Sequence, residues 1–162
     1  MQHLLDRQNQ IALEILGEDE PCWMTCYYDD LARIKPHPEW GWGISDRINQ
    51  HAKRRFNMKC VQTFYDSDDF IFWIYAAPTV WRQNRFDSLQ RHIARDYVKM
   101  MWVSRRTGAI FAPYEGGLDL ILPDLAQKEH LRQTYANWLA PPSSEHKAQP
   151  PLGRIMRFDI MT

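Results

Sequence analysis

The sequence predicts a single α+β domain in which an antiparallel meander sheet is flanked by helices. Segments with a helical apolar period alternate with segments rich in β-branched and aromatic residues, which predicts both helices and strands. Short turns join most of the predicted strands, and short turns favour antiparallel pairing. The chain has 162 residues, 44% hydrophobic and 25% charged, as expected of one globular domain.

The first third of the chain is expected to hold two helices and one strand. Residues 3–17 place apolar residues on one side of a helix, and Gly17 can end it. Residues 22–28 are rich in strand formers. The segment 35–43 contains two prolines and two glycines, so we expect a loop there, with Ser45 capping the next helix.

The middle of the chain is expected to form a hairpin followed by a helix. Residues 59–66 and 69–77 are two predicted strands joined by an acidic turn. The second is apolar on both sides, which indicates a central strand covered on both faces. Residues 84–97 return to a helical period.

A second hairpin and a last helix are predicted from residue 99 onward. Residues 99–104 and 109–114 form the hairpin, and residues 115–117 turn the chain into a strand at 118–122. Asp124 is placed to cap a final helix, because an aspartate accepts a hydrogen bond from the first turn.

A change of composition marks the predicted boundary of the globular domain. We assign residues 1–140 to the domain and residues 141–162 to a flexible tail, because prolines and serines dominate the start of that tail. The last residues of the tail are apolar again. They either dock as an added strand or lie loose.

Charge and cysteine usage limit the environment and the partners. The chain has 20 basic and 20 acidic residues, so no net charge draws it to nucleic acid or an anionic membrane. Cys22, Cys26 and Cys60 are an odd number without a disulfide framework, which is typical of a reducing compartment. With no signal segment and no run of ~20 apolar residues, we expect a cytoplasmic protein, monomeric or weakly dimeric.

Familiar catalytic and cofactor motifs are missing from the sequence. There is no glycine-rich phosphate loop, no nucleophile elbow and no His-Glu-x-x-His pair. Cys22 and Cys26 lack a second Cys/His pair at zinc spacing. We therefore predict no catalytic residue, no cofactor and no metal.

The segment that begins at Tyr114 is the most distinctive part of the sequence. Two glycines permit a tight reversal that would bring Tyr114, Glu115 and Asp119 together as an acidic, aromatic knob. Such a knob could receive basic residues of a protein partner through charge-assisted hydrogen bonds. The alternative is a strand-to-strand turn whose acids are solvated or bond locally.

Two further segments are candidate partner contacts. The turn with Asp66, Asp68 and Asp69 could complement a basic partner, or it is a solvated hairpin tip. Trp40 and Trp42 alternate with two glycines, where they anchor in a partner's pocket, stack on a base or cover the edge of the sheet.

Basic residues gather on the outer side of the second predicted helix. Arg47, Lys53, Arg54 and Arg55 could contact phosphate. The zero net charge and the lack of a nucleic-acid-binding motif favour a solvated face instead. His92 lies on the next predicted helix without a recognisable catalytic companion, and we interpret it as a surface histidine.

Two short motifs resemble those of an uncharacterised bacterial family. In that family a Tyr-Asp-Gly-Gly-x-Asp segment follows a strand, and here residues 114–119 match it with Glu115 in place of the first Asp. The later Tyr135-Ala136-Asn137-Trp138-Leu139 is similar to the end of the family's following helix. The resemblance covers roughly residues 60–140. Members of such groups are often encoded beside secreted toxins, so it implies an immunity protein.

Three functions follow as expectations. The first is an immunity protein that binds a cognate secreted toxin domain and neutralises it by contact. The second is an enzyme of an unfamiliar class in which Glu115 and Asp119 form an acid–base pair on a small molecule or modified protein. The third is an oligomer held by an edge strand or by the apolar C-terminal residues.

Overall fold

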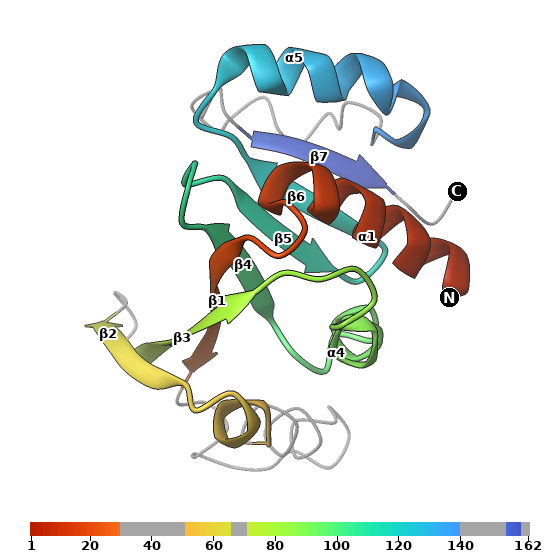
Figure 1. Ribbon diagram of the computed structural model, residues 1–162. Coiled ribbons are helices and arrows are strands. Elements are labelled where there is room, and N and C mark those ends of the chain that lie inside the picture. Colours follow the sequence, from red (N-terminus) through yellow and green to blue (C-terminus); the bar gives the residue numbers. More distant parts are fainter. Residues whose placement is uncertain (30–50, 66–70, 140–154, 160–162) are drawn as a thin grey trace.

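The strands form one antiparallel sheet. The computed structural model describes residues 1–29, 51–65, 71–139 and 155–159. Its strands are β1 (Pro21–Asp29), β2 (Lys59–Tyr65), β3 (Ile71–Val80), β4 (Met100–Ser104), β5 (Ile110–Tyr114), β6 (Gly117–Ile121) and β7 (Ile155–Asp159). Within these residues the sheet has seven strands in the order β2-β3-β1-β4-β5-β6-β7 (Figure 1). Every neighbouring pair is antiparallel, which confirms the predicted α+β class.

Helices occur before and between the strands of the described residues. They are α1 (Gln2–Leu16), α4 (Asp87–Ile93), α5 (Leu125–Thr134) and the 3-10 turn η1 (Ala136–Trp138). Residues 51–55 are also helical. The predicted cap of the last helix is confirmed, because the side chain of Asp124 accepts a 2.9 Å hydrogen bond from the amide of Ala126.

Strand β1 joins two groups of strands that are contiguous in the chain. It pairs with β3 on one side and with β4 on the other, so the hairpin β2–β3 and the meander β4–β5–β6 share one sheet. Both predicted hairpins are confirmed. Residues 155–159 form β7 against β6. In the edge pair β2–β3 the register shifts between Cys60 and Gln62, which is a β-bulge.

Strand β3 differs from the central, doubly covered strand that its composition indicates. It lies one position from the edge, next to β2. One side of it faces the core, where Ala77 is buried, but Pro78 on the other side is exposed. An apolar run by itself does not specify which faces are covered, since that depends on the layers packed around the sheet.

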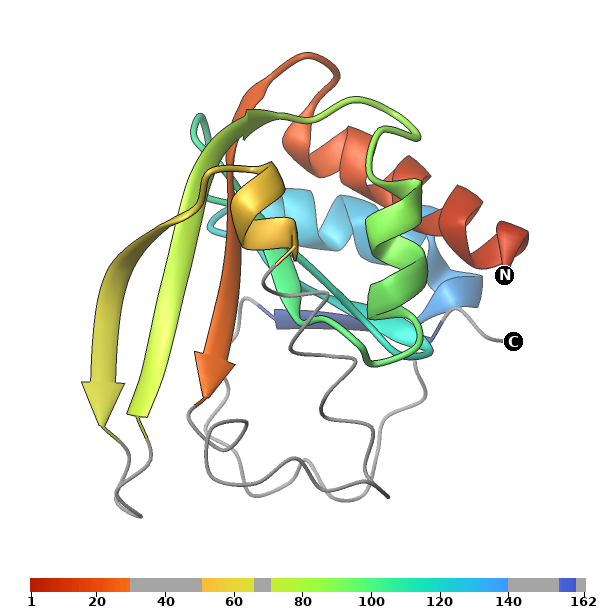
Figure 2. The same ribbon diagram turned by 90° about the horizontal axis from the view of Figure 1, so that it is seen from below.

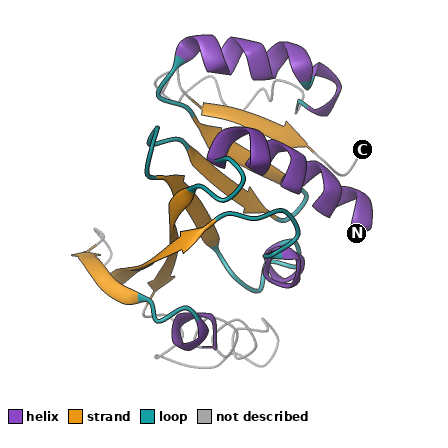
Figure 3. Ribbon diagram, in the orientation of Figure 1, coloured by secondary structure: helices purple, strands orange, loops and turns teal. Residues whose placement is uncertain are grey.

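The described helices all lie on one face of the sheet, called here the helix face (Figures 2 and 3). Helix α1 contacts β4 and β5, and α4 contacts α1 and β5. Tyr135, after α5, packs its ring 6.4 Å from that of Phe158 on β7. Met58, after the helical residues 51–55, brings its sulfur 3.8 Å from the Cys26 thiol on β1.

Alternating burial along the strands confirms that the opposite face is not covered by these helices. Met24 and Trp102 are cross-strand partners and fully buried on the helix face. Trp23 and Val103 are the next pair, and Trp23 is 40% exposed on the other side. Side chains alternate between the two sides of a strand, so this other side, called the open face, contains every second residue.

An aromatic cluster forms the centre of the core on the helix face. The Trp81 and Trp102 rings meet edge to face at 5.4 Å, and both contact Phe111 at 5.6 and 5.9 Å. Phe86 adds contacts of 5.3 Å to Trp81 and 5.2 Å to Trp102. Ring pairs at these separations contribute about 0.5–1.5 kcal/mol each beyond their buried area. The cluster therefore fixes the start of α4 against the sheet.

Helix α4 is shorter than the predicted helix over residues 84–97. Asn84 and Asp96, on either side of it, have positive φ angles of 64° and 56°. A left-handed residue cannot continue a right-handed helix, and Asn and Asp adopt that conformation more readily than most residues. The helical period was correctly predicted, but these two local backbone reversals limit it to Asp87–Ile93.

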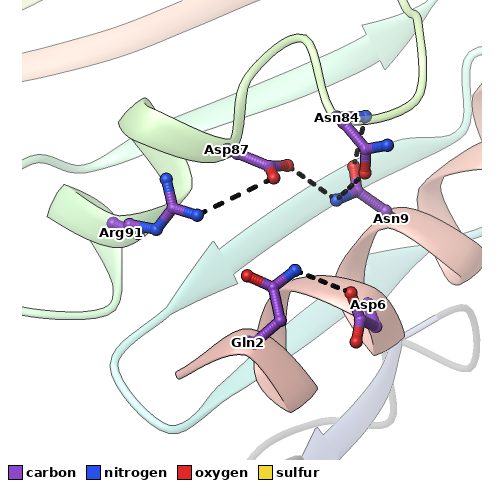
Figure 4. A network of polar contacts seen from close by, with 6 residues as sticks. All are labelled: Gln2, Asp6, Asn9, Asn84, Asp87 and Arg91. Carbon is purple, nitrogen blue, oxygen red and sulfur yellow. Dashed lines mark hydrogen bonds and ion pairs between the residues drawn. The ribbon is translucent and has the colours of Figure 1, made fainter.

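A polar contact fastens α4 to α1 (Figure 4). Asn9, buried on α1, donates from Nδ2 to the Asp87 carboxylate at 2.8 Å and to the Asn84 side-chain oxygen at 3.4 Å. The amide of Asn84 donates back to the Asn9 oxygen at 3.3 Å. Arg91 approaches the same Asp87 at 4.0 Å. One side chain thus links the two helices and the turn that precedes α4.

We expect Asn9→Ala to destabilise the protein by about 1–3 kcal/mol, because it removes the buried partner of Asp87 and Asn84. Urea unfolding followed by circular dichroism measures this. Gln2→Ala on the same helix is the control, since Gln2 is exposed and its side chain bonds to the nearby Asp6 among the described residues. Equal stability of the two variants would contradict the prediction.

A second contact fastens the C-terminal helical segment to α1. The Tyr135 hydroxyl donates to the Glu14 carboxylate at 2.6 Å, and His130 Nε2 lies 3.2 Å from the other Glu14 oxygen. Burial, followed by the hydrogen bond to Glu14, raises the pKa of Tyr135 from 10.0 to about 12. Folding therefore favours the protonated phenol. The resulting stability is complete below pH 10.0 and is lost as the pH rises towards about 12.

We expect the stability advantage of the wild-type protein over Tyr135→Phe to shrink as the pH rises between 10.0 and about 12. Below that window the hydrogen bond should favour the wild type by about 0.5–1.5 kcal/mol. Urea unfolding across the pH series measures the difference. A Tyr97→Phe variant reports the general effect of losing one phenol. A difference that stays constant across the series would rule out this coupling.

Candidate functional site

The Tyr-Glu-Gly-Gly-Leu-Asp segment forms the tight turn between β5 and β6. Tyr114 pairs with Gly117, and Ala112 pairs with Asp119, so Tyr114 and Asp119 are diagonal neighbours on the open face. Glu115 lies at the tip of the turn and is exposed. The structure therefore places Tyr114 and Asp119 on one surface, with Glu115 at its end.

Both glycines of this segment have structural reasons. Gly116 has a φ of 79°, a conformation that other residues adopt with strain. A Cβ on Gly117 would lie 2.3 Å from the carbonyl oxygen of Phe158 and 2.8 Å from the Tyr114 hydroxyl. Gly117 thus allows β7 and the Tyr114 ring to approach closely. This explains the Gly-Gly pair without any chemistry at the turn.

The proposed acid–base pair gains no support from this arrangement. Glu115 is exposed and Asp119 is partly exposed on a sheet surface, and neither lines the two cavities described around residues 51–58 and α4. General acid–base work needs carboxyl groups that meet a bound substrate in a concave site. The enzyme reading stays a hypothesis.

The other predicted contact residues lie outside the described part of the chain. They are Trp40, Trp42, Asp66, Asp68 and Asp69.

An apolar stripe crosses the open face, and sequence reasoning missed it. Cross-strand pairing places Pro78 next to Trp23, Trp23 next to Val103, and Val103 next to Ile110. Ile121 pairs with Ile110 and is 38% exposed. We call Pro78, Trp23, Val103, Ile110 and Ile121 the apolar stripe. It runs over five neighbouring strands, β3-β1-β4-β5-β6.

Arg105 extends the stripe with a cation. It follows β4, and its Cζ lies 5.4 Å from the centroid of the Trp23 ring. An arginine over an indole face is held by the quadrupole of the ring, and the pair presents a flat, amphipathic surface. The signal in the sequence is the alternation of residues 22–26, in which Trp23 falls between buried positions. That alternation does not reveal which side a sheet leaves open.

None of the cysteines is part of a disulfide or of a metal-binding group among the described residues. Burial raises the pKa of both Cys22 and Cys26 to about 11, so both stay protonated at neutral pH. Cys60 is exposed and not in a disulfide. In the four described ranges, no group of three or more His, Cys, Asp or Glu residues could hold a metal ion.

A family model described as a domain of unknown function (DUF3885) matches residues 1–141. The chain belongs to the DUF3885 family. The match covers every described element of the DUF3885 chain from α1 to η1 and leaves out β7. No curated protein and no solved structure matches it significantly. Among the residues with described structure, no helix is long and apolar enough to cross a membrane.

Proposed function

We propose that the protein is an immunity protein that binds a cognate toxin domain through the open face of its sheet and neutralises it by contact. The observation that carries this proposal is the apolar stripe. Antiparallel sheets with one face towards water usually alternate apolar and polar residues. Here that outer side instead carries a Trp, a Pro and three aliphatic residues in register.

The chemistry of the stripe suits a protein partner. Trp and Arg are the residues most enriched at binding hot spots, and Trp23 and Arg105 lie against each other on this surface. The hydrogen-bonded sheet preforms the surface, so little conformational entropy is lost when a partner docks. The partner that we infer is a folded protein with an apolar patch of similar extent.

Charges of opposite sign at the two ends of the open face would orient a bound partner. The turn after β4 carries Arg105 and Arg106, whereas the turn after β5 carries Glu115, with Asp119 beside it. Consecutive antiparallel strands place these two turns at opposite ends of the sheet. A toxin with basic residues at one end of its contact surface would bind in one orientation. The likeness of residues 114–119 to proteins encoded beside secreted toxins is a second support.

The deciding experiment is calorimetric titration with the purified C-terminal domain of a candidate secreted toxin, chosen by the proximity of its gene. We expect 1:1 binding with a dissociation constant in the nanomolar range, typical of specific complexes of standard size. Sedimentation of the free protein is the control, because self-association would bury the same stripe. Two folded proteins that do not bind would overturn the proposal for this pair.

We expect Trp23→Ala to weaken that complex by about 2 kcal/mol or more, about 30-fold, because it removes the central anchor of the stripe. Leu125→Ala is the matched control, since Leu125 is also an exposed apolar residue, 63% exposed, but lies on α5 over the helix face. Calorimetry with both variants measures the difference. Equal affinities would move the contact surface away from the stripe.

We expect the double charge reversal Glu115→Lys and Asp119→Lys to slow association and weaken the complex at low salt, because rim charges steer encounter. Stopped-flow association rates at two salt concentrations measure this. The paired control is Glu115→Gln with Asp119→Asn, which removes charge without reversing it and should lie between. An association rate unchanged by reversal would remove these residues from the interface.

A further inference from the structure

A cavity on the helix side of the molecule combines basic and apolar walls. It lies between the helical residues 51–55 and α4 and has a volume of about 250 Å³. Arg55 and Arg85 line it from the two sides, and Phe56, Phe86 and Leu89 supply apolar surface. The apolar stripe lies on the opposite face, so this cavity is separate from the proposed toxin contact.

The charge of the cavity walls has one sign. Its lining residues include Arg55, Arg85 and two histidines, and no Asp or Glu. Within the described ranges, neither guanidinium forms a salt bridge. Arg85 makes one long hydrogen bond of 3.4 Å, to the carbonyl of Val80. Two guanidinium groups around one hollow favour an anion, and their planar donors suit phosphate or carboxylate.

Each guanidinium group lies near an aromatic ring. The Cζ of Arg55 lies 5.6 Å from the Phe56 ring centroid, and that of Arg85 lies 5.5 Å from the Phe86 ring. The two rings contact each other at 6.1 Å. Phe86 is also part of the buried aromatic cluster, so this wall of the cavity is fixed by the core. The buried Phe86 ring thus gives the cavity one preformed wall.

His92 and Asp87 of α4 also favour a ligand site in this cavity. His92 lines the cavity, and its buried Nδ1 has no hydrogen-bond partner among the described residues. Buried polar atoms are usually paired, so this nitrogen has hydrogen-bonding capacity left for a ligand or a bound water. Asp87 is the one acidic residue within α4, and its carboxylate is engaged by Asn9 of α1 and by Arg91. It does not line the cavity.

We propose that this cavity binds a small organic anion in which a phosphate or carboxylate is attached to a flat apolar ring. The guanidinium groups would bind the anionic head, and Phe56 and Leu89 would pack against the ring. Pockets for drug-sized ligands have volumes of about 300–1,000 Å³, so this cavity of about 250 Å³ suits a smaller ligand with a single ring. This site goes beyond the proposed toxin binding and does not depend on it.

The test is calorimetric titration of the full chain with phenyl phosphate, with benzoate as the carboxylate probe. Phenol and inorganic phosphate are the controls, because each carries one half of the recognised chemistry. We expect phenyl phosphate or benzoate to bind at least about tenfold more tightly than either control, since charge and apolar contact add. No binding of either ring-bearing anion would overturn the proposal.

Substitution of Ser88 tests the position of the site. Ser88 lines the cavity and is exposed on α4, so its replacement should not unfold the protein. We expect Ser88→Glu to weaken binding of the ring-bearing anion by about tenfold or more, through charge repulsion. Ser88→Gln introduces a side chain of the same shape as glutamate without its charge, and it should change binding little. Equal binding by the two variants would place the anion elsewhere.

A pair of adjacent arginines separates this site from a general basic surface. Arg55 lines the cavity, whereas Arg54, its neighbour on the same helix, lines a different hollow beside Tyr75. We expect Arg55→Gln to weaken binding about tenfold and Arg54→Gln to leave it unchanged. Equal losses in both variants, together with tighter binding of a single-stranded RNA oligonucleotide than of phenyl phosphate, would indicate a nucleic-acid surface and refute a small-ligand site.

Discussion

The packing of Trp81, Phe86, Trp102 and Phe111 is the interaction on which the rest of the structure depends. These four rings come from the turn after β3, the start of α4, and strands β4 and β5, and they meet at 5.2 to 5.9 Å. Removing such a ring from a core typically costs about 3–5 kcal/mol. The two indole N–H groups have no acceptor among the described residues, which offsets part of that gain. Apolar contact therefore outweighs hydrogen bonding at this centre.

The cluster also explains why the two surfaces of the molecule differ. It fixes the start of α4 on one side of the sheet, where Phe86 connects the core to the wall of the basic cavity. The other side of the same strands is left to the apolar stripe. Trp102 and Val103 are consecutive residues of β4, and one is fully buried while the other lies on the open face. Core and candidate contact surface are thus the two faces of one set of strands.

Sequence reasoning succeeds where a local pattern decides the structure and stops where distant residues must meet. The periods of residues 3–17 and the hairpin at 99–114 follow from residue types nearby, and both are confirmed. The stripe depends on the register of β1 against β3 and β4, which no local pattern contains. Arg55 and Arg85 are also distant in the chain, so no local pattern indicates that they line the same cavity. The Gly-Gly turn was found correctly, but its second glycine serves the close approach of β7.

The bulge in β2 decides how another protein can approach the sheet. An unpaired edge strand offers its backbone to an added strand, and this is a common way of recruiting a peptide. At this edge the register shift between Cys60 and Gln62 interrupts the regular spacing of donors and acceptors that such an addition needs. A partner at that end of the sheet would therefore recognise side chains rather than backbone. Its specificity would then be set by those side chains and open to change by single substitutions.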